Sequence, residues 1–113
     1  MLALTFELPH DYIEFLRASN GGEGFLGQNY VMLWRVEELK PLDDSYEVAQ
    51  YAPKLLLFGS NGGGEAYAFN MRVSPWAVVK VPFIGMGDAQ SAILLACSFA
   101  EFLNNMAHDQ AAV

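Results

Sequence analysis

The chain has few of the features that secreted and membrane proteins need. Cys97 is its one cysteine, so no internal disulfide can form, which favours a reducing compartment. Residues 1–7 contain no basic side chain and only a short apolar run, unlike a secretory signal. The longest strongly apolar run, Ala92 to Cys97, is far too short to span a bilayer. We therefore expect a cytoplasmic protein that does not bind membranes.

Basic residues are also scarce. Six Lys and Arg stand against thirteen Asp and Glu, which gives a formal net charge of -7 at pH 7. This charge repels phosphate backbones, so direct nucleic-acid binding is disfavoured. Five acidic residues fall within residues 37–47, where only Lys40 is basic: Glu37, Glu38, Asp43, Asp44 and Glu47. This acidic stretch is either a solvated loop or a docking surface for a basic partner.

The sequence lacks the residue groups that common catalytic and metal sites require. Cys97 has no neighbouring histidine or basic residue, so we expect a small core side chain and not a reactive thiol. His10 and Glu14 can share one helix face, but two ligands make only half a metal site. The segment Gly59 to Gly64 lacks the Lys and the following helix of a phosphate-binding loop, which favours a plain hairpin turn. We therefore expect no catalytic residue, no enzymatic activity, no metal and no cofactor.

Patterns in the first half of the chain predict short elements. Pro9 followed by apolar residues at helical spacing predicts a short helix, which Asn20-Gly21-Gly22 closes with a left-handed glycine cap. Residues Tyr30 to Trp34 have the composition of a strand. A helical turn follows and ends before Pro41, and a second short helix is predicted over residues 43–51.

The second half predicts a sheet and then a helix. Two apolar runs, Leu55 to Phe58 and Ala66 to Phe69, flank the glycine-rich segment and predict an antiparallel hairpin. Trp76 to Val81 has the pattern of a largely buried strand. Asp88 can cap a long helix whose apolar positions recur at steps of three and four: Ala92, Ala96, Phe99, Leu103 and Met106.

These elements predict one α+β domain over residues 1–113. Its mostly antiparallel sheet is flanked by a short N-terminal helix and a long C-terminal helix. The length is typical of one domain, and no linker-like stretch divides the chain. Hydrophobic residues make up 53% of the sequence, which is enough to fill a core without disulfides.

Five short segments occur in an order that resembles the SUKH superfamily, the Smi/Knr type of bacterial immunity proteins. The segments are residues 8–16, 20–24, 33–34, 58–65 and 98–103. The residues that carry the resemblance are Pro9, Tyr12, Phe15, Leu16, Asn20, Gly21, Gly22, Trp34, Phe58, Gly59, Gly62 and Gly64. We expect them to shape the fold by capping helices, filling the core and turning a hairpin. Superfamily members usually carry a further helix before the Leu-Pro pair. We expect that helix to be absent here, either because this chain is a variant or because its start is incomplete.

The resemblance implies a non-catalytic protein-binding domain. Bacterial members neutralise polymorphic toxins by direct binding, and fungal relatives are interaction hubs in cell-wall signalling. The leading hypothesis is therefore an immunity protein that binds a basic toxin domain, such as a nuclease, through the acidic stretch. The alternatives are an intracellular regulatory scaffold and a small ligand-binding domain that uses the glycine-rich segment. Self-association is left open.

Overall fold

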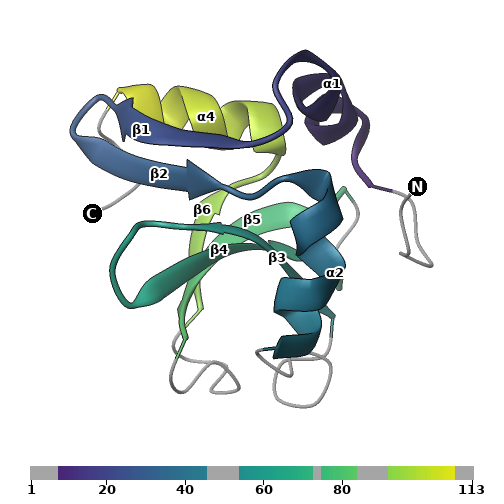
Figure 1. The fold of residues 1–113 in the computed structure, drawn as a ribbon. Helices are drawn as coiled ribbons and strands as arrows, with labels where there is room; N and C mark the ends of the chain where they lie inside the picture. Colours follow the sequence, from purple (N-terminus) through teal and green to yellow (C-terminus); the bar gives the residue numbers. More distant parts are fainter. Residues whose placement is uncertain (1–7, 46–53, 73–74, 84–91, 109–113) are drawn as a thin grey trace.

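The computed structural model describes residues 8–45, 54–72, 75–83 and 92–108. The helices are α1 (His10–Ala18), α2 (Val36–Ser45) and α4 (Phe99–Ala107). The strands are β1 (Gly22–Leu26), β2 (Asn29–Leu33), β3 (Leu55–Ser60), β4 (Glu65–Asn70), β5 (Ala77–Pro82) and β6 (Ile93–Ala96). The predicted α+β fold is confirmed, with an antiparallel sheet and a helix near each end of the chain (Figure 1). The segment ahead of Leu8, where we expected no further helix, lies outside the described residues.

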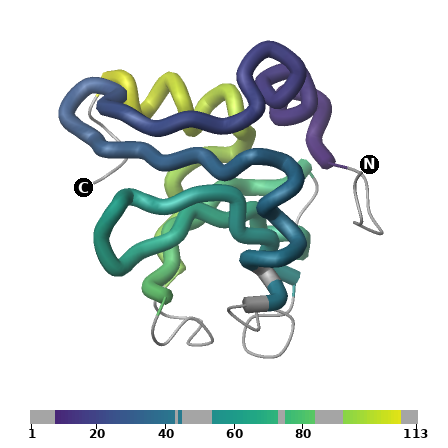
Figure 2. The backbone as a smooth tube through the Cα atoms, in the orientation of Figure 1, coloured from purple at the N-terminus to yellow at the C-terminus, as the bar shows by residue number. Residues whose placement is uncertain are grey.

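The strands form one curled sheet in which spatial order follows chain order. Every neighbouring pair is antiparallel, from β1 at one end to β6 at the other. Figure 2 shows the chain following this curved path, with α4 lying close to β1. Asn29 at the start of β2 donates from Nδ2 to the Met106 carbonyl (2.9 Å), and Asn105 donates from Nδ2 to the Leu95 carbonyl in β6 (3.2 Å). Helix α4 is therefore hydrogen-bonded to β2, next to one edge of the sheet, and to β6 at the other edge.

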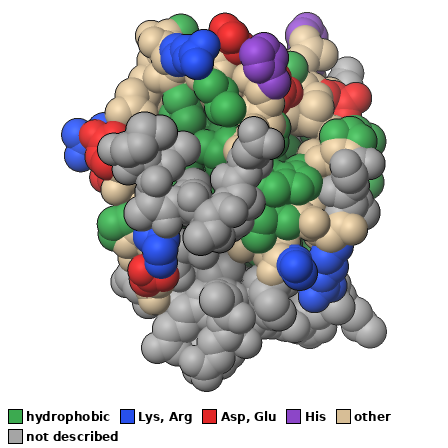
Figure 3. Space-filling view, turned by 90° about the vertical axis from the view of Figure 1, so that its right-hand side faces the viewer, with side chains coloured by type: hydrophobic (Ala, Val, Ile, Leu, Met, Phe, Trp, Pro, Cys, Tyr) green, Lys and Arg blue, Asp and Glu red, His purple; other side chains and the backbone are tan. Residues whose placement is uncertain are grey.

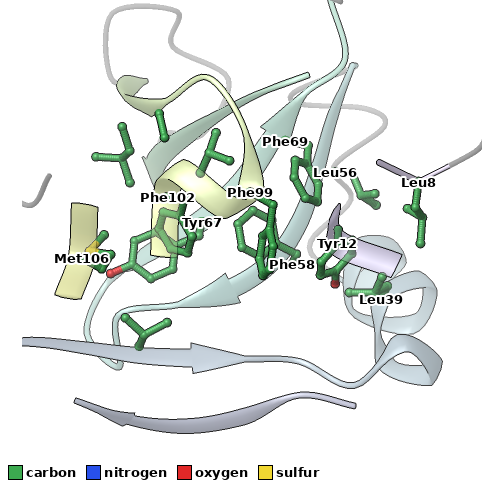
Figure 4. Packing of buried hydrophobic residues seen from close by; sticks show 14 residues of the cluster. Leu8, Tyr12, Leu39, Leu56, Phe58, Tyr67, Phe69, Phe99, Phe102 and Met106 are labelled. Carbon is green, nitrogen blue, oxygen red and sulfur yellow. The ribbon is translucent and has the colours of Figure 1, made fainter. Parts of the chain in front are cut away.

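An aromatic core fills the concave face of the sheet. Figure 4 shows Tyr12 from α1 and Phe99 and Phe102 from α4 close to Phe58 and Phe69 on the strands. Ring centroids lie 4.9 Å apart for Tyr12 and Phe99 and 4.5 Å apart for Phe58 and Phe69. Such aromatic packing adds stability beyond the burial of area. The two terminal helices are therefore held against the sheet by one shared cluster.

The opposite face of the central strands is apolar as well. A second buried cluster lies there: Leu57, Ala66, Ala68, Val79 and Val81. Because successive side chains of a strand point to opposite faces, these residues alternate with members of the main core. Trp34 packs against both clusters. The prediction of a largely buried strand over Trp76 to Val81 is confirmed, although β5 begins at Ala77.

The predicted C-terminal helix is confirmed, but it is shorter than expected. Residues Ile93–Ala96 form strand β6, which pairs with β5, and α4 begins only at Phe99. The backbone hydrogen bonds of this edge strand outweigh a helical spacing that four apolar residues in a row produce by chance. Ser98 caps α4 by accepting the Glu101 N–H at Oγ (3.1 Å), and Asp88 lies outside the described residues.

Two further boundaries differ from expectation. Helix α2 runs through Pro41, so the predicted break there is wrong; residues 46–51 of the second predicted helix lie outside the described part. Helix α1 ends at Ala18, and Ser19 is extended with φ -154°, so no left-handed glycine closes it.

Strand β1 was not predicted, because a Gly-Glu-Gly segment has low strand propensity. The predicted hairpin is confirmed as β3 and β4.

Candidate protein-binding surface at helix α2

The N-terminus of α2 is fixed by a side chain far away in sequence. Asn20 accepts the Val36 N–H at Oδ1 (2.9 Å) and donates from Nδ2 to Glu37 Oε1 (2.7 Å). The first N–H groups of a helix have no partner within the helix, and an Asn side chain can satisfy one of them. Asn20 therefore caps α2, whereas the sequence had suggested that it closes α1.

Gly21 allows the backbone of residues 33–35 to lie close to the turn after α1. A Cβ at residue 21 would lie 2.8 Å from the Leu33 carbonyl oxygen and 3.0 Å from the Arg35 nitrogen, both in backbone that cannot move aside easily. Gly21 also has φ +91°, a conformation that other residues rarely adopt. The Asn20-Gly21 pair thus brings the end of β2 and the start of α2 against the turn after α1.

Three acidic residues of the stretch have described side chains, and all three lie on α2: Glu37, Glu38 and Asp44. Glu37 and Asp44 are seven residues apart, about two helical turns, so they share one face. Glu38 accepts the Arg35 N–H at Oε1 (2.9 Å) and pairs with the Arg35 guanidinium (3.7 Å). Asp44 pairs with Lys40 Nζ (2.9 Å). Asp43 lies on α2 without a described side chain, and Glu47 lies outside the described residues.

The charges of this helix are partly compensated. The hydrogen bond from Asn20 is the largest cause that holds the pKa of the Glu37 carboxyl below its usual value. Glu37 is thus ionised near neutral pH, and its partner Asn20 is neutral. Two acids in the first turn also suit the positive end of the helix dipole. Glu37 therefore keeps more of its negative charge available to a partner than the paired Glu38 and Asp44.

Figure 3 looks at the side of the molecule that lies to the right in Figure 1, where α1 and α2 are. Acidic side chains appear singly on this face, interspersed with basic ones. Hydrophobic side chains gather between them, next to atoms of residues that are not described. The described carboxylates therefore act as separate charges on a mixed surface.

The residues that were considered for metal and thiol chemistry do not form a metal site in the described part of the chain. His10 Nε2 and Glu14 Oε2 are 3.5 Å apart on the exposed face of α1. Within residues 8–45, 54–72, 75–83 and 92–108, no three His, Cys, Asp or Glu side chains gather closely enough to hold a metal ion. Cys97 is exposed, so its expected place in the core is wrong: β6 ends before it and leaves it in the turn to α4.

The glycine-rich segment is a hairpin turn whose polar groups hydrogen-bond to one another. The Gly62 N–H binds Ser60 Oγ (2.9 Å), and the Gly63 N–H binds Asn61 Oδ1 (2.9 Å). Asn61 also donates from Nδ2 to Glu65 Oε1 (2.9 Å). Both amides are thus occupied within the turn, which argues against an anion cradle here.

The remaining residues of the resemblance lie in or beside the core. Tyr12 and Phe58 are fully buried, and Phe15, Leu16 and Trp34 pack against the main cluster. Pro9 directly precedes α1, and Gly22 has φ +143°. A Cβ at residue 59 would collide with the Met32 carbonyl oxygen, Gly62 has φ +80°, and a Cβ at residue 64 would meet nothing within 4 Å.

Sequence reasoning missed one feature of the surface, an apolar groove between β1 and the helices α1 and α4. Its signal was the alternation of glycines in Gly22-Glu23-Gly24, which leaves one strand face without side chains. The cap at Ser98 was also readable, since Ser98 and Glu101 have the spacing of a capping box.

Comparison with known proteins identifies the family. No curated protein matches the chain significantly. In the part of the chain that the structure describes, no helix is long and apolar enough to cross a membrane. The SMI1 / KNR4 family (SUKH-1) matches residues 2–105, which is nearly the whole sequence. This family includes immunity proteins of polymorphic toxin systems, which bind toxin proteins, and SUKH proteins are generally non-catalytic. With this match over most of its length, the chain belongs to the SMI1/KNR4 (SUKH-1) family.

Proposed function

We propose that this chain is an immunity protein that neutralises a polymorphic toxin by binding it directly. The match to the SMI1 / KNR4 family over residues 2–105 carries the proposal. The net charge of -7 supports a partner with a basic surface, such as a nuclease domain that must hold phosphate. Inhibition then follows from occlusion of that surface and needs no catalytic residue.

Helix α2 is the part of the described surface that best fits this contact. Its exposed carboxylates attract a basic partner and speed its approach, since complementary charge acts mainly on the association rate. Asn20 accepts the Val36 N–H and donates to Glu37, which holds the first turn of α2 in place, so the helix is ordered before it binds. A preorganised surface loses little conformational entropy on association.

The experiment first tests whether a toxin reading frame lies next to the gene and then measures association with the toxin domain that it encodes. One variant removes three charges from α2: Glu37→Gln, Glu38→Gln and Asp44→Asn. A matched control removes three charges from other described elements, α1, β4 and α4: Glu14→Gln, Glu65→Gln and Glu101→Gln. Each changes the formal net charge of -7 by the same amount. Stopped-flow fluorescence at several salt concentrations gives the association rate of each protein.

The α2 variant is expected to associate about tenfold more slowly at low salt, with a flatter salt dependence, while the control changes much less. Equal slowing of both variants would mean that only net charge matters and that α2 is not the contact. If the neighbouring toxin neither binds the wild-type chain nor loses activity in its presence, the immunity proposal itself fails.

A further inference from the structure

The apolar groove beside β1 is lined by two strands and two helices. It has a volume of about 330 Å³ and lies between strands β1 and β2 on one side and helices α1 and α4 on the other. Its apolar walls come from all four elements: Phe15, Leu26, Val31, Leu33 and Leu103. A groove of this volume is at the lower end of the range for sites that bind small ligands or inserted side chains.

Two glycines keep the groove open. Gly24 pairs with the buried Val31, so Gly22 and Gly24 lie on the strand face that looks toward the helices. A Cβ at either position would meet nothing within 4 Å, which means that the space beside them is unfilled. Any larger residue would need φ near +143° or +157°, which side chains with a Cβ rarely adopt.

Strand β1 is also an edge of the sheet. It is first in the strand order, and among the described residues no strand pairs with its outer edge. Natural edge strands commonly carry Lys or Pro to prevent pairing, but residues 22–26 contain neither. Phe25, on the other face of β1, is 71% exposed and packs edge-to-face on Tyr30 with centroids 5.2 Å apart. An exposed aromatic next to an open edge is typical of binding surfaces.

One carboxylate decides the charge of the site. Among the described residues that line the groove, Glu23 alone is charged, and its side chain lies on the opposite face of β1. Its carboxylate accepts a hydrogen bond from the Tyr30 hydroxyl, which is neutral, and within the described ranges no cation forms an ion pair with it. Glu23 and Phe25 lie on one strand face, and the groove lies on the other. A partner strand therefore meets a negative charge on one face and an apolar groove on the other.

We propose that β1 is a docking edge for an extended segment of a partner protein in which apolar and basic residues alternate. The segment lies along β1 and extends the sheet, as in other domains that bind peptides beside an edge strand. Its apolar side chains enter the groove over Gly22 and Gly24, and its basic side chains reach Glu23. A second copy of this chain fits poorly, because both copies carry a net charge of -7. The proposal goes beyond the contact at α2 and does not depend on it.

The test uses the full chain and a short capped peptide in which Leu and Val alternate with Lys. A matched peptide carries Glu in place of Lys. Titration followed by amide NMR reports which residues respond and gives a dissociation constant. The expected result is saturable binding of the basic peptide, with shifts at Gly22, Gly24 and Leu103, and slower hydrogen exchange along β1. The acidic peptide is expected to cause no comparable shifts.

Two pairs of variants separate the site from general effects. Glu23→Lys is expected to weaken binding about tenfold, while Glu14→Lys, with the same change of net charge on the exposed face of α1, has less than about a twofold effect. Leu103→Phe fills the groove from α4 and is expected to abolish binding, while Leu94→Phe on exposed β6 does not. Circular dichroism checks that each variant folds.

Three results would overturn the proposal. An absence of amide shifts at the groove on addition of the basic peptide would mean that the peptide does not bind there. Equal weakening by Glu23→Lys and Glu14→Lys would reduce the effect to net charge. Dimerisation of the free chain through β1, seen by sedimentation together with protection of the same amides, would make a second copy the occupant.

Discussion

Two polar side chains near α1 cap helices α2 and α4. Asp11 accepts the Ala100 N–H at Oδ2 (2.9 Å) in the first turn of α4, and Asn20 accepts the Val36 N–H (2.9 Å) at the start of α2. Each satisfies a backbone donor that has no partner within its own helix. The segment around α1 therefore positions both helices by hydrogen bonds in addition to its packing.

Asn20→Ala is expected to lower the free energy of unfolding by about 1 kcal/mol, the usual cost of a lost helix cap. Urea unfolding followed by circular dichroism measures the change. Asn105→Ala, which removes an amide from α4, serves as a comparison that should leave the exchange rates of the first amides of α2 unaltered. If Asn20→Ala leaves those amides equally protected, the cap does not hold α2.

The same substitution is expected to raise the pKa of Glu37 toward its ordinary value of 4.5, because it removes the hydrogen bond that lowers it. Carboxyl NMR titration measures this shift. A depressed folded-state pKa contributes stability above the unfolded-state pKa, and this contribution is lost as pH falls through the folded-state value. The stability difference between wild type and Asn20→Ala should therefore shrink in acid; a constant difference would exclude the Asn20–Glu37 bond as a contributor.

Tyr12 holds a hydroxyl in the core without a partner. Its side chain is fully buried, and among the described residues no group hydrogen-bonds its hydroxyl. Burial raises the pKa of Tyr12, because the phenolate would be far from water. A polar group in this position costs free energy that an apolar one does not.

Tyr12→Phe is expected to stabilise the fold by about 1 kcal/mol, since it removes the unpaired hydroxyl and keeps the ring. Thermal and urea unfolding provide the measurement. Tyr30 is a suitable control, because it is half-buried and its hydroxyl donates to the Glu23 carboxylate, so Tyr30→Phe should not stabilise the fold. Loss of stability in Tyr12→Phe would reveal a hydrogen-bond partner for the hydroxyl.

At the scale of elements, α2 lacks one of its backbone hydrogen bonds. Pro41 lies in its interior and has no N–H to donate to the carbonyl one turn earlier. Pro41→Ala restores this donor at an exposed position and is expected to raise stability by about 1 to 3 kcal/mol. Amide exchange in residues 36–45 should slow in parallel. Unchanged exchange would mean that Pro41 does not limit the helix.

The elements that could be predicted are those in which the spacing of apolar residues along the chain indicates both the type of element and the face that it buries. The hairpin of β3 and β4 followed from two apolar runs around glycines, and α1 followed from apolar residues at helical spacing. Strand β6 could not be separated from a helix, because Ile93–Ala96 is apolar throughout and has no period of its own. Its identity depends on pairing with β5, which is a long-range contact.

The candidate site was predictable only in part. The acidic residues of α2 were found as a charge cluster, but the pairing of Asp44 with Lys40 depends on the helix continuing through Pro41. The role of Asn20 was misread, because its partners Val36 and Glu37 are distant in sequence. Local patterns cannot indicate a cap supplied across the fold.

At the scale of the whole molecule, Trp34 links the two buried clusters on opposite faces of the sheet. Because the clusters share strands β3, β4 and β5, loss of one should disrupt the other. We expect residues 1–113 to unfold in one cooperative transition, as most small domains do. Tryptophan fluorescence and far-ultraviolet circular dichroism should give coincident curves in urea. Separate midpoints would divide the chain into two units.

The curled sheet with α4 across its ends also has a consequence for the folding pathway. Adjacent strands follow one another along the chain, so the meander can form through short-range steps that are fast. The bond from Asn29 to the Met106 carbonyl joins residues 77 positions apart and must close a much longer loop. We expect this closure after the rate-limiting step, so Asn29→Ala should accelerate unfolding and leave the refolding rate nearly unchanged in stopped-flow experiments. The contact that joins α4 to β2 would then form late in folding, after the strands have paired.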